Sequence, residues 1–503
     1  MRLDVIPSEF LLDRAALELE LPTTVDDYRA EVEAEYGFGA DPLKALENDV
    51  LREFAIPDLL SINNLPAFDD VLLGEDLFDD SWADELGDDL ENLHHRKDRN
   101  ENEYKYKFGN VFEANWYRQF LCPDARDKTY RLSSRDNQGE FRCLFRMPLS
   151  KVDDLVSTFL ENGWVPSTRK ENDDETFQTR AELLILAALN VLGHHTPFRA
   201  LRSSTEICYS THLKFFQLFL DKMYSIKDDV IYYPRSMEEL SSVSNRYANV
   251  SFPGCGGSID VVHMKWSYCP AGDFNRCKGK EGYPTLAFEV VTGFDREIFG
   301  ISSVQFGTRN DKHIVKLDET VNKIKNDWYS TVEWQYYDVL GNLHNVIGIY
   351  LICDGGYLRW PILVCPFQHE SAASQKGYFS ARLESIRKDV ECVFGILKKR
   401  WRILEFGIRF RDIKIVEKVF VVCAMLHNIM LTEMKTTDTQ FRVGRGSPNP
   451  GDAVWLRGPV PLPAVRNGGE RHMAMEWGKR RQALAGHVEY MARSAKRRRL
   501  NGL

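Results

Sequence analysis

The stretch that decides the fold is GSIDVVHMKW, residues 257–266, in which apolar and polar residues alternate. An alternation of period two is typical of a β-strand with one buried face. Two more strand-like stretches follow after short polar breaks, YPTLAFEVVTGF at 283–294 and EIFGISSVQFG at 297–307. Three such stretches in a row predict a meander of three strands.

The chain after this meander predicts helices that cover a sheet. A helix is expected at 311–328, and a fourth apolar strand at 346–353 that ends at Asp354. Two long helices are expected later, at about 381–404 and 413–434. This order of elements indicates an α/β fold in which a mixed sheet is flanked by helices.

The segment before the meander is predicted to be helical. AELLILAALNVL at 181–192 predicts a buried helix, and Pro197 interrupts the pattern soon after it. Ser203-Ser204-Thr205-Glu206 matches a capping box and predicts the start of the next helix. Two helices joined by a short turn resemble a helix-turn-helix, and an ordinary helical hairpin gives the same pattern. Whether 181–224 contacts DNA is left open.

Charge is divided unevenly along the 503 residues. The formal net charge is −9, but residues 1–100 hold 27 Asp and Glu against 8 Lys and Arg. The remaining chain is net basic, which suggests a nucleic-acid partner, and a solvated acidic arm without a partner is the plainer alternative. The predicted parts are an acidic, largely disordered arm at 1–103, a helical domain at 104–250, an α/β domain at 251–434, and a Pro/Gly linker with a basic tail at 435–503.

Several classes of protein are excluded. No run of the chain reaches the roughly 18 apolar residues of a membrane span, so no membrane partner is expected. The ten Cys are scattered and never form Cys-x-x-Cys, which argues against a zinc ribbon or a disulfide framework. The sequence therefore predicts a protein of a reducing compartment.

Three carboxylates stand at informative places in the α/β segment. Asp260 lies within the first strand, Asp354 lies at the end of the fourth, and Glu391 lies at the margin of a helical apolar stripe. Strands one and four are neighbours in a ribonuclease H-like sheet, where such carboxylates would converge. Converged carboxylates repel one another and take up protons unless cations bind. A site that offers only oxygen ligands selects Mg²⁺ or Mn²⁺. From spacing alone, three unrelated surface acids are the more ordinary interpretation.

Several strings resemble, in their order, a PIF/Harbinger-type transposase of the plant-transposon branch. They cover roughly Phe252 to Leu431 and are GSIDVVHMKW, GTRND (307–311), DGGYLRWP (354–361), RKDVECVFGILKKRWRIL (387–404) and LHNIML (426–431). The resemblance implies that 251–434 is a ribonuclease H-like DDE catalytic core. The segment 312–353 looks longer than in compact members of the family, and its role is left open.

The resemblance also implies the site residues. Asp260, Asp354 and Glu391 would be the catalytic acids and would bind a divalent cation, Mg²⁺ or Mn²⁺. Asp311 matches an additional acidic position of the family and is a further candidate metal ligand, which Asn310 would orient.

The function implied by the resemblance is DNA cleavage and strand transfer at transposon ends, in the nucleus. Transposon ends and target DNA would be the partners, together with a Myb-like accessory DNA-binding protein, since family members often work with one. A homo-oligomeric state is left open. Two alternatives also stay open: a domesticated, non-catalytic DNA- or chromatin-binding regulator, and a bare metal-dependent nuclease.

Clusters of basic residues supply candidate DNA contacts and a candidate import signal. The candidates near Glu391 are Lys388, Lys398, Lys399, Arg400 and Arg402, for which a solvated helix face is the alternative. The candidate import signal consists of Lys496, Arg497, Arg498 and Arg499, on a tail expected to be flexible. A chain truncated after Gly469 is therefore expected to fold, to cleave DNA and to remain largely cytoplasmic.

Overall fold

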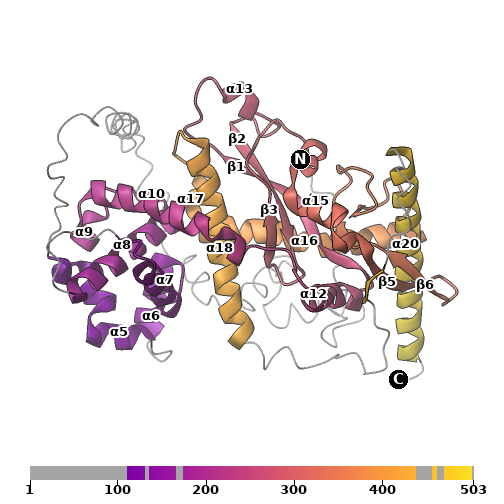
Figure 1. Cartoon of the computed structure of the whole chain (residues 1–503), viewed down its shortest axis with the longest axis horizontal. Helices are drawn as coiled ribbons and strands as arrows, with labels where there is room; N and C mark the ends of the chain where they lie inside the picture. The colour runs from indigo at the N-terminus through magenta and orange to yellow at the C-terminus, as the bar shows by residue number, and fades with distance from the viewer. Residues whose placement is uncertain (1–109, 131–134, 166–173, 438–455, 461–469, 501–503) are drawn as a thin grey trace, which may run out of the picture. The chain divides into compact units, whose positions relative to one another are not determined.

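The computed structural model describes residues 110–130, 135–165, 174–437, 456–460 and 470–500 (Figure 1). The predicted acidic arm at 1–103 lies outside these residues. The described residues divide into two compact units. One contains residues 110–187 and 197–214, and the other contains 188–196 and the chain from 215 onward.

The first unit is helical. Its elements are η6 (Val111–Glu113), η7 (Tyr117–Leu121), α5 (Pro123–Tyr130), α6 (Arg135–Phe145), α7 (Leu149–Glu161), α9 (Arg202–Thr205), most of α8 (Asp174–His194) and the start of α10 (Tyr209–Ser225). Its core includes three fully buried rings, Phe120, Phe141 and Phe145, whose centroids lie 4.7–5.8 Å apart. Such aromatic contacts add to the free energy gained by burying apolar area. The buried helix predicted at 181–192 is confirmed within α8.

The capping box predicted at 203–206 is wrong. Glu206 has φ +56° and ends α9 in the left-handed region, so α10 begins only at Tyr209. The Thr205 hydroxyl instead accepts a hydrogen bond from the backbone N–H of Ile207 (3.2 Å) and contacts Nε2 of buried His212 (2.8 Å). Other local contacts of Thr205 therefore replace the predicted capping pattern.

The second unit is built on a mixed sheet with the strand order β3-β2-β1-β7-β8. Its strands are β1 (Cys255–Lys265), β2 (Thr285–Thr292), β3 (Ile298–Ile301), β4 (Gln305–Phe306), β7 (Tyr350–Ile352) and β8 (Leu363–Val364). β1, β2 and β3 pair antiparallel, which confirms the predicted meander. β7 runs parallel to β1, and β8 runs parallel to β7. A mixed sheet of this order, flanked by helices, is compatible with a ribonuclease H-like core.

Two predicted elements are interrupted. The strand expected at 346–353 divides at Gly348, which has φ +93°, into β6 (Leu343–Ile347) and β7, and these belong to different sheets. Glycine adopts this conformation without steric cost. The helix expected at 311–328 divides into α14 (Asp311–Leu317) and α15 (Glu319–Asn326), because the carboxylate of Asp318 caps α15 by accepting a hydrogen bond from a backbone N–H (2.7 Å).

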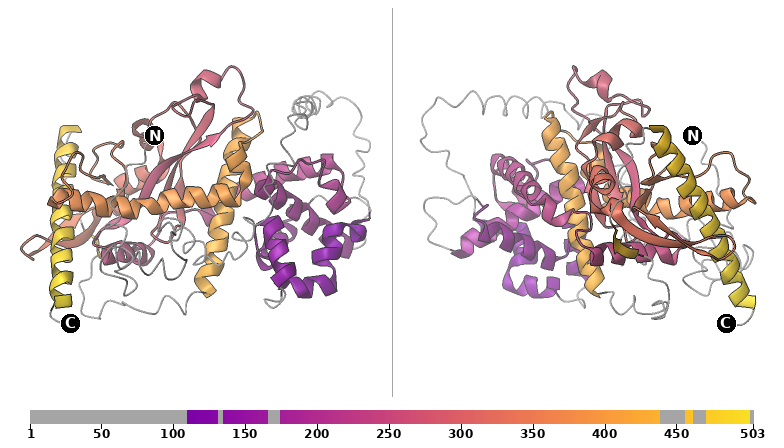
Figure 2. Two further views of the ribbon diagram at one scale, coloured as in Figure 1. Left: turned by 180° about the vertical axis from the view of Figure 1, so that it is seen from behind. Right: turned by 45° about the vertical axis from the view of Figure 1, so that its right-hand side comes forward.

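Helices pack around the mixed sheet. α12 (Met237–Asn249) and the long α16 (Gln375–Arg400) contact β1, α14 contacts β2, and α18 (Ile413–Thr437) contacts β3 (Figure 2). Shorter helices of this unit are α11 (Lys227–Val230), α13 (Phe274–Cys277), η8 (Trp328–Thr331) and α17 (Arg402–Phe406). Because α12 packs on β1, this unit extends before the boundary predicted at residue 250. No helix among the described residues is both long enough and apolar enough to cross a membrane.

Part of the segment 312–353 belongs to a second, three-stranded sheet. β5 (Val332–Tyr337) lies between β6 and β9 (Leu456–Pro459), and its Trp334 is fully buried. α20 (Glu470–Leu500) packs against β5 and α16 (Figure 1). Residues far apart in the sequence thus cover one end of the mixed sheet together.

The prediction of a flexible basic tail is wrong for residues 470–500. Leu484, Ala485 and Val488 of α20 are buried. The guanidinium groups of Arg480 and Arg481 donate hydrogen bonds of 2.6–2.8 Å to the backbone carbonyls of Ile347, Pro361 and Pro366. These basic residues therefore hold the fold together, and we no longer expect a chain truncated after Gly469 to fold. Lys496 is exposed, and the side chains of Arg497, Arg498 and Arg499 lie outside the described residues.

Candidate active site

Asp260 lies in β1, and Asp354 lies two residues after the end of β7, the neighbouring parallel strand. Ser258 of β1 is in register with Ile352 of β7, and each acid follows its register residue by two positions. Residues that are in register on parallel strands and two positions apart lie on one face of the sheet. The pairing of β1 with β7 therefore brings together two acids that are 94 positions apart in the sequence.

Asp311 joins Asp354 from the start of α14. Asn310 caps this helix, since its side-chain oxygen accepts a hydrogen bond from the backbone N–H of His313 (3.1 Å). A Cβ atom placed on Gly356 would lie 3.0 Å from Oδ1 of Asp354 and 3.1 Å from Oδ2 of Asp311. The two carboxylates thus flank Gly356, where any larger residue would push them apart.

Glu391 is connected to Asp260 through an arginine. The guanidinium of Arg387, one helical turn before Glu391 on α16, donates from Nη1 to Oδ2 of Asp260 (2.8 Å) and pairs through Nη2 with Oε1 of Glu391 (2.6 Å). Its Nε donates to Oε2 of Glu384 (3.0 Å). The side chain of Arg387 is 13% exposed, whereas that of Glu391 is 47% exposed. The first and third predicted acids are therefore held by one shared cation.

The electrostatics of the cluster show an excess of negative charge. Burial raises the pKa of Asp260 to about 6, against the opposing attraction of Arg387, and the charges of Asp354 and Glu391 add to the rise. Burial also raises the pKa of Asp311, and the charge of Asp354 adds to this rise. Carboxylates that raise one another's pKa values are stabilised in their ionised form when a cation binds between them.

The donor chemistry of this cluster fits a hard divalent cation, because Asp260, Asp311 and Asp354 offer only carboxylate oxygens. The arrangement is not yet that of a complete metal site. Among the described residues, no group of three or more His, Cys, Asp or Glu side chains is placed to hold one ion. Asp260 and Glu391 are engaged by Arg387 instead.

Comparison with known proteins agrees with this architecture. Residues 231–438 match the family model described as plant transposon protein. The protein called "Protein ALP1-like" from Arabidopsis thaliana is 21% identical to this chain over 226 residues, which are 43% of this chain and 53% of the relative. Both matches support the resemblance of this domain to PIF/Harbinger-type transposases. The chain spans about half of the length of this curated relative, and no solved structure matches it.

The candidate DNA contacts of this transposase-type domain do not all lie on one surface. By helical spacing, Lys388, Lys398 and Lys399 share with Glu391 one broad face of α16, on which Gly395 borders open space. Arg400 projects from the opposite side, and its Nη1 lies 3.5 Å from Nδ1 of the buried His427. Arg402 belongs to the next helix, α17. The structure therefore places three of the five predicted basic residues beside Glu391.

Sequence reasoning missed two charged residues of the transposase-type domain, Arg387 and Glu289. Glu289 lies in β2 and is fully buried. Burial raises its pKa well above the usual value, and the charges of Asp318, Asp311 and Asp260 add to the rise. The available signal was a single charged residue inside an otherwise apolar strand.

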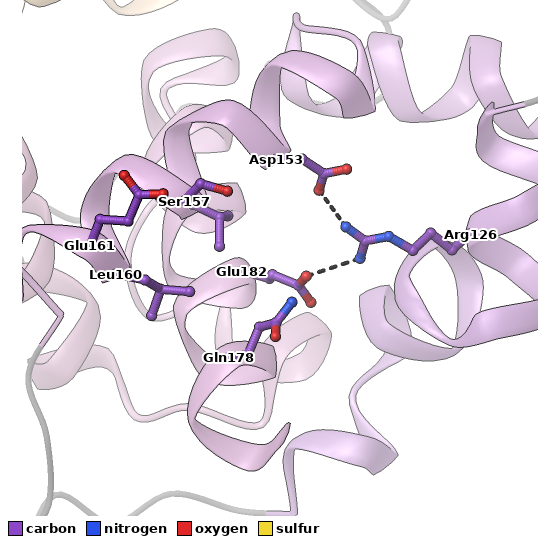
Figure 3. Close-up of a pocket in the computed structure, with 8 residues that line it drawn as sticks. Arg126, Asp153, Ser157, Leu160, Glu161, Gln178 and Glu182 are labelled. Atoms are coloured by element: carbon purple, nitrogen blue, oxygen red, sulfur yellow. Dashed lines mark hydrogen bonds and ion pairs between the residues drawn. The ribbon is translucent and has the colours of Figure 1, made fainter. Parts of the chain in front are cut away.

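A hollow in the helical unit is lined mainly by acidic and uncharged side chains. It has a volume of about 360 Å³, and its lining includes Arg126, Asp153, Glu161, Gln178 and Glu182 (Figure 3). Arg126 pairs with Oε1 of Glu182 (2.9 Å) and with Asp153. Three acids against one base disfavour a DNA phosphate here. This hollow therefore gives no support to DNA binding by the helical segment, which the sequence left open.

Proposed function

We propose that this protein is a DNA transposase or endonuclease that performs divalent-metal-dependent phosphodiester cleavage and strand transfer at transposon ends. The observation that carries the proposal is the register of β1 and β7, which aligns Asp260 with Asp354, two residues after the end of the adjacent parallel strand. Asp311 lies against Asp354, and Glu391 is joined to Asp260 by Arg387. These residues lie inside the segment that matches plant transposon proteins.

The residues that would hold Mg²⁺ or Mn²⁺ are Asp260, Asp311 and Asp354, with Glu391 completing the set. Such an ion, when bound, supplies activation of a water or hydroxyl nucleophile and stabilisation of the leaving oxygen in an in-line displacement. The backbone N–H of Val261 donates to Oδ1 of Asp260 (2.9 Å), and that of Gly356 donates to Oδ1 of Asp354 (2.8 Å). These bonds orient both acids before any ligand arrives.

The substrate side of the proposal rests on the exposed face of α16. Lys388, Lys398 and Lys399 would hold DNA phosphates beside Glu391, because cationic side chains on one helix face follow a phosphate backbone. Transposon ends and target DNA are the proposed partners, together with a Myb-like accessory protein. The proposed compartment is the nucleus, with Lys496, Arg497, Arg498 and Arg499 as the import signal.

The proposal is tested with the full chain and a plasmid that carries the DNA flanking the gene. Wild type is expected to nick the plasmid in Mg²⁺ and to be inactive in EDTA. Asp260→Asn and Glu391→Gln are expected to lose this activity while they keep the wild-type circular dichroism spectrum. Asp154→Asn is the matched control, because this exposed acid of the helical unit pairs only with Lys151 among the described residues. Equal nicking by all four proteins would contradict the assigned site.

Import is tested separately on the full chain, because truncation would remove α20. Substitution of Gln at Lys496, Arg497, Arg498 and Arg499 in a fluorescent fusion is expected to leave the protein in the cytoplasm. Nuclear accumulation of that variant would contradict this part of the proposal.

A further inference from the structure

Arg387 has an unusual set of partners. Its three guanidinium nitrogens each contact a different carboxylate, those of Asp260, Glu384 and Glu391. Two of these acids belong to the proposed metal-binding set, whereas Glu384 does not. The side chains of Arg387 and Asp260 are only 13% and 19% exposed, so their ion pair is less screened by water than an ordinary surface pair. Glu391 is 47% exposed, so its pair with Arg387 is more strongly screened.

We propose that Arg387 is an internal counter-ion that competes with the divalent metal for Asp260 and Glu391. In the metal-free protein the guanidinium neutralises these two acids and holds α16 against β1. A metal ion that takes their oxygens competes with the guanidinium, because two cations close to the same carboxylate oxygens repel each other. The inference rests on the proposed function, since it assumes that this cluster binds a metal.

A guanidinium displaced from Asp260 and Glu391 can stay bonded to Glu384. Glu384 lies one turn before Arg387 on α16, bonds Nε, and its side chain is 30% exposed. Arg387 can therefore release Asp260 and Glu391 while it keeps one ion pair near solvent. Glu384 thereby lowers the cost of metal entry, so the loss of Glu384 and the loss of Arg387 should change metal affinity in opposite directions.

Binding of Mn²⁺ to the full chain without DNA tests this inference, with free Mn²⁺ measured by electron paramagnetic resonance. We expect Arg387→Gln to bind Mn²⁺ on the order of tenfold more tightly than wild type, because a cation close to the site is removed. Glu384→Gln is expected to bind severalfold more weakly. Lys376→Gln is the matched control, since it removes one positive charge from the same helix at a residue paired with Glu370, and it should match wild type.

The outcomes separate the two proposals. Affinity of Arg387→Gln equal to or weaker than wild type, with binding lost in Asp260→Asn, would overturn the competition and leave the proposed function standing. Absence of Mn²⁺ binding by both wild type and Arg387→Gln would overturn the proposed function and this inference with it. If Arg387→Gln does not fold, Glu384→Gln still decides, because tighter or unchanged binding by that variant contradicts the role assigned to Glu384.

Discussion

Each unit of the protein holds one arginine between acidic side chains, yet the two arrangements have different surroundings. In the helical unit, Arg126 joins Asp153 and Glu182 at the edge of an open hollow. In the sheet unit, Arg387 joins three acids, and the charges of further acids act on this group.

The difference shows what distinguishes an ion pair that serves the fold from a candidate catalytic cluster. Around Arg126, burial raises the pKa values of Asp153 and Glu182, and the charge of a neighbouring acid adds to each rise. The arginine pairs with both acids and offsets the rise in each. Around Arg387, the charge of Asp354 also raises the pKa values of both Asp260 and Asp311. Carboxylates fixed on two strands and two helices retain a surplus of negative charge that a divalent cation would neutralise.

The largest effect is expected from removal of α20, which should destabilise the sheet unit and leave the stability of the helical unit unchanged. Truncation after Gly469 removes Leu484, Ala485 and Val488 from the core and leaves carbonyls bonded by Arg480 and Arg481 without partners. We expect the sheet unit to lose about 5 kcal/mol or more and to become sensitive to proteases, while the helical unit stays resistant. Limited proteolysis with mass spectrometry measures this, and a resistant sheet unit would contradict the role of α20.

The next largest effect compares one acid from each region. Asp354→Asn is expected to reduce Mg²⁺-dependent DNA cleavage by about 1,000-fold, because a charge is lost from the proposed metal site while the shape is kept. Asp153→Asn, the counterpart beside Arg126, is expected to leave the cleavage rate unchanged. Rates of plasmid nicking measure both effects. Similar losses in the two variants would mean that the two acidic clusters do not differ in their role in DNA cleavage.

A smaller effect is expected when each arginine is replaced by Met. Arg126→Met and Arg387→Met should each lower the free energy of unfolding by about 2 kcal/mol, because buried carboxylates lose their partner. Addition of Mg²⁺ should restore stability only in Arg387→Met, where an ion can replace the guanidinium. Urea denaturation with and without Mg²⁺ measures this, and recovery of Arg126→Met would show that both clusters bind metal.

The smallest effect concerns the pH dependence that Glu289 contributes. Its folded-state pKa lies well above the usual 4.5, so the stability that it contributes is complete below pH 4.5 and is lost as pH rises toward the folded-state pKa. Glu289→Gln removes this loss, so its advantage over wild type should grow by about 1 kcal/mol per pH unit from pH 5 upward. Urea denaturation at pH 5, 6 and 7 measures the trend, and a constant difference would mean that Glu289 is not protonated in the fold.

The alternation of GSIDVVHMKW and the apolar runs of the two stretches after it were sufficient to predict the meander, because both patterns are local properties of the chain. The same patterning placed Asp260 inside a strand and Asp354 at a strand end. It could not predict the division at Gly348 or at Asp318. Those breaks depend on a second sheet and on a helix cap, and neither leaves a periodic signal.

The sequence by itself determined the types of the main elements, the order of the carboxylates and the resemblance of the α/β segment to transposases. Only the tertiary structure decided which charges meet. Arg387 and Arg400 both lie on α16, yet helical phase turns Arg387 toward the acids and Arg400 toward His427. Arg480 and Arg481 lie in the segment predicted to be a basic tail, but the carbonyls that they bond come from residues more than 100 positions earlier. Long-range pairing of this kind depends on packing, because nothing in the local pattern of residues encodes the identity of a distant partner.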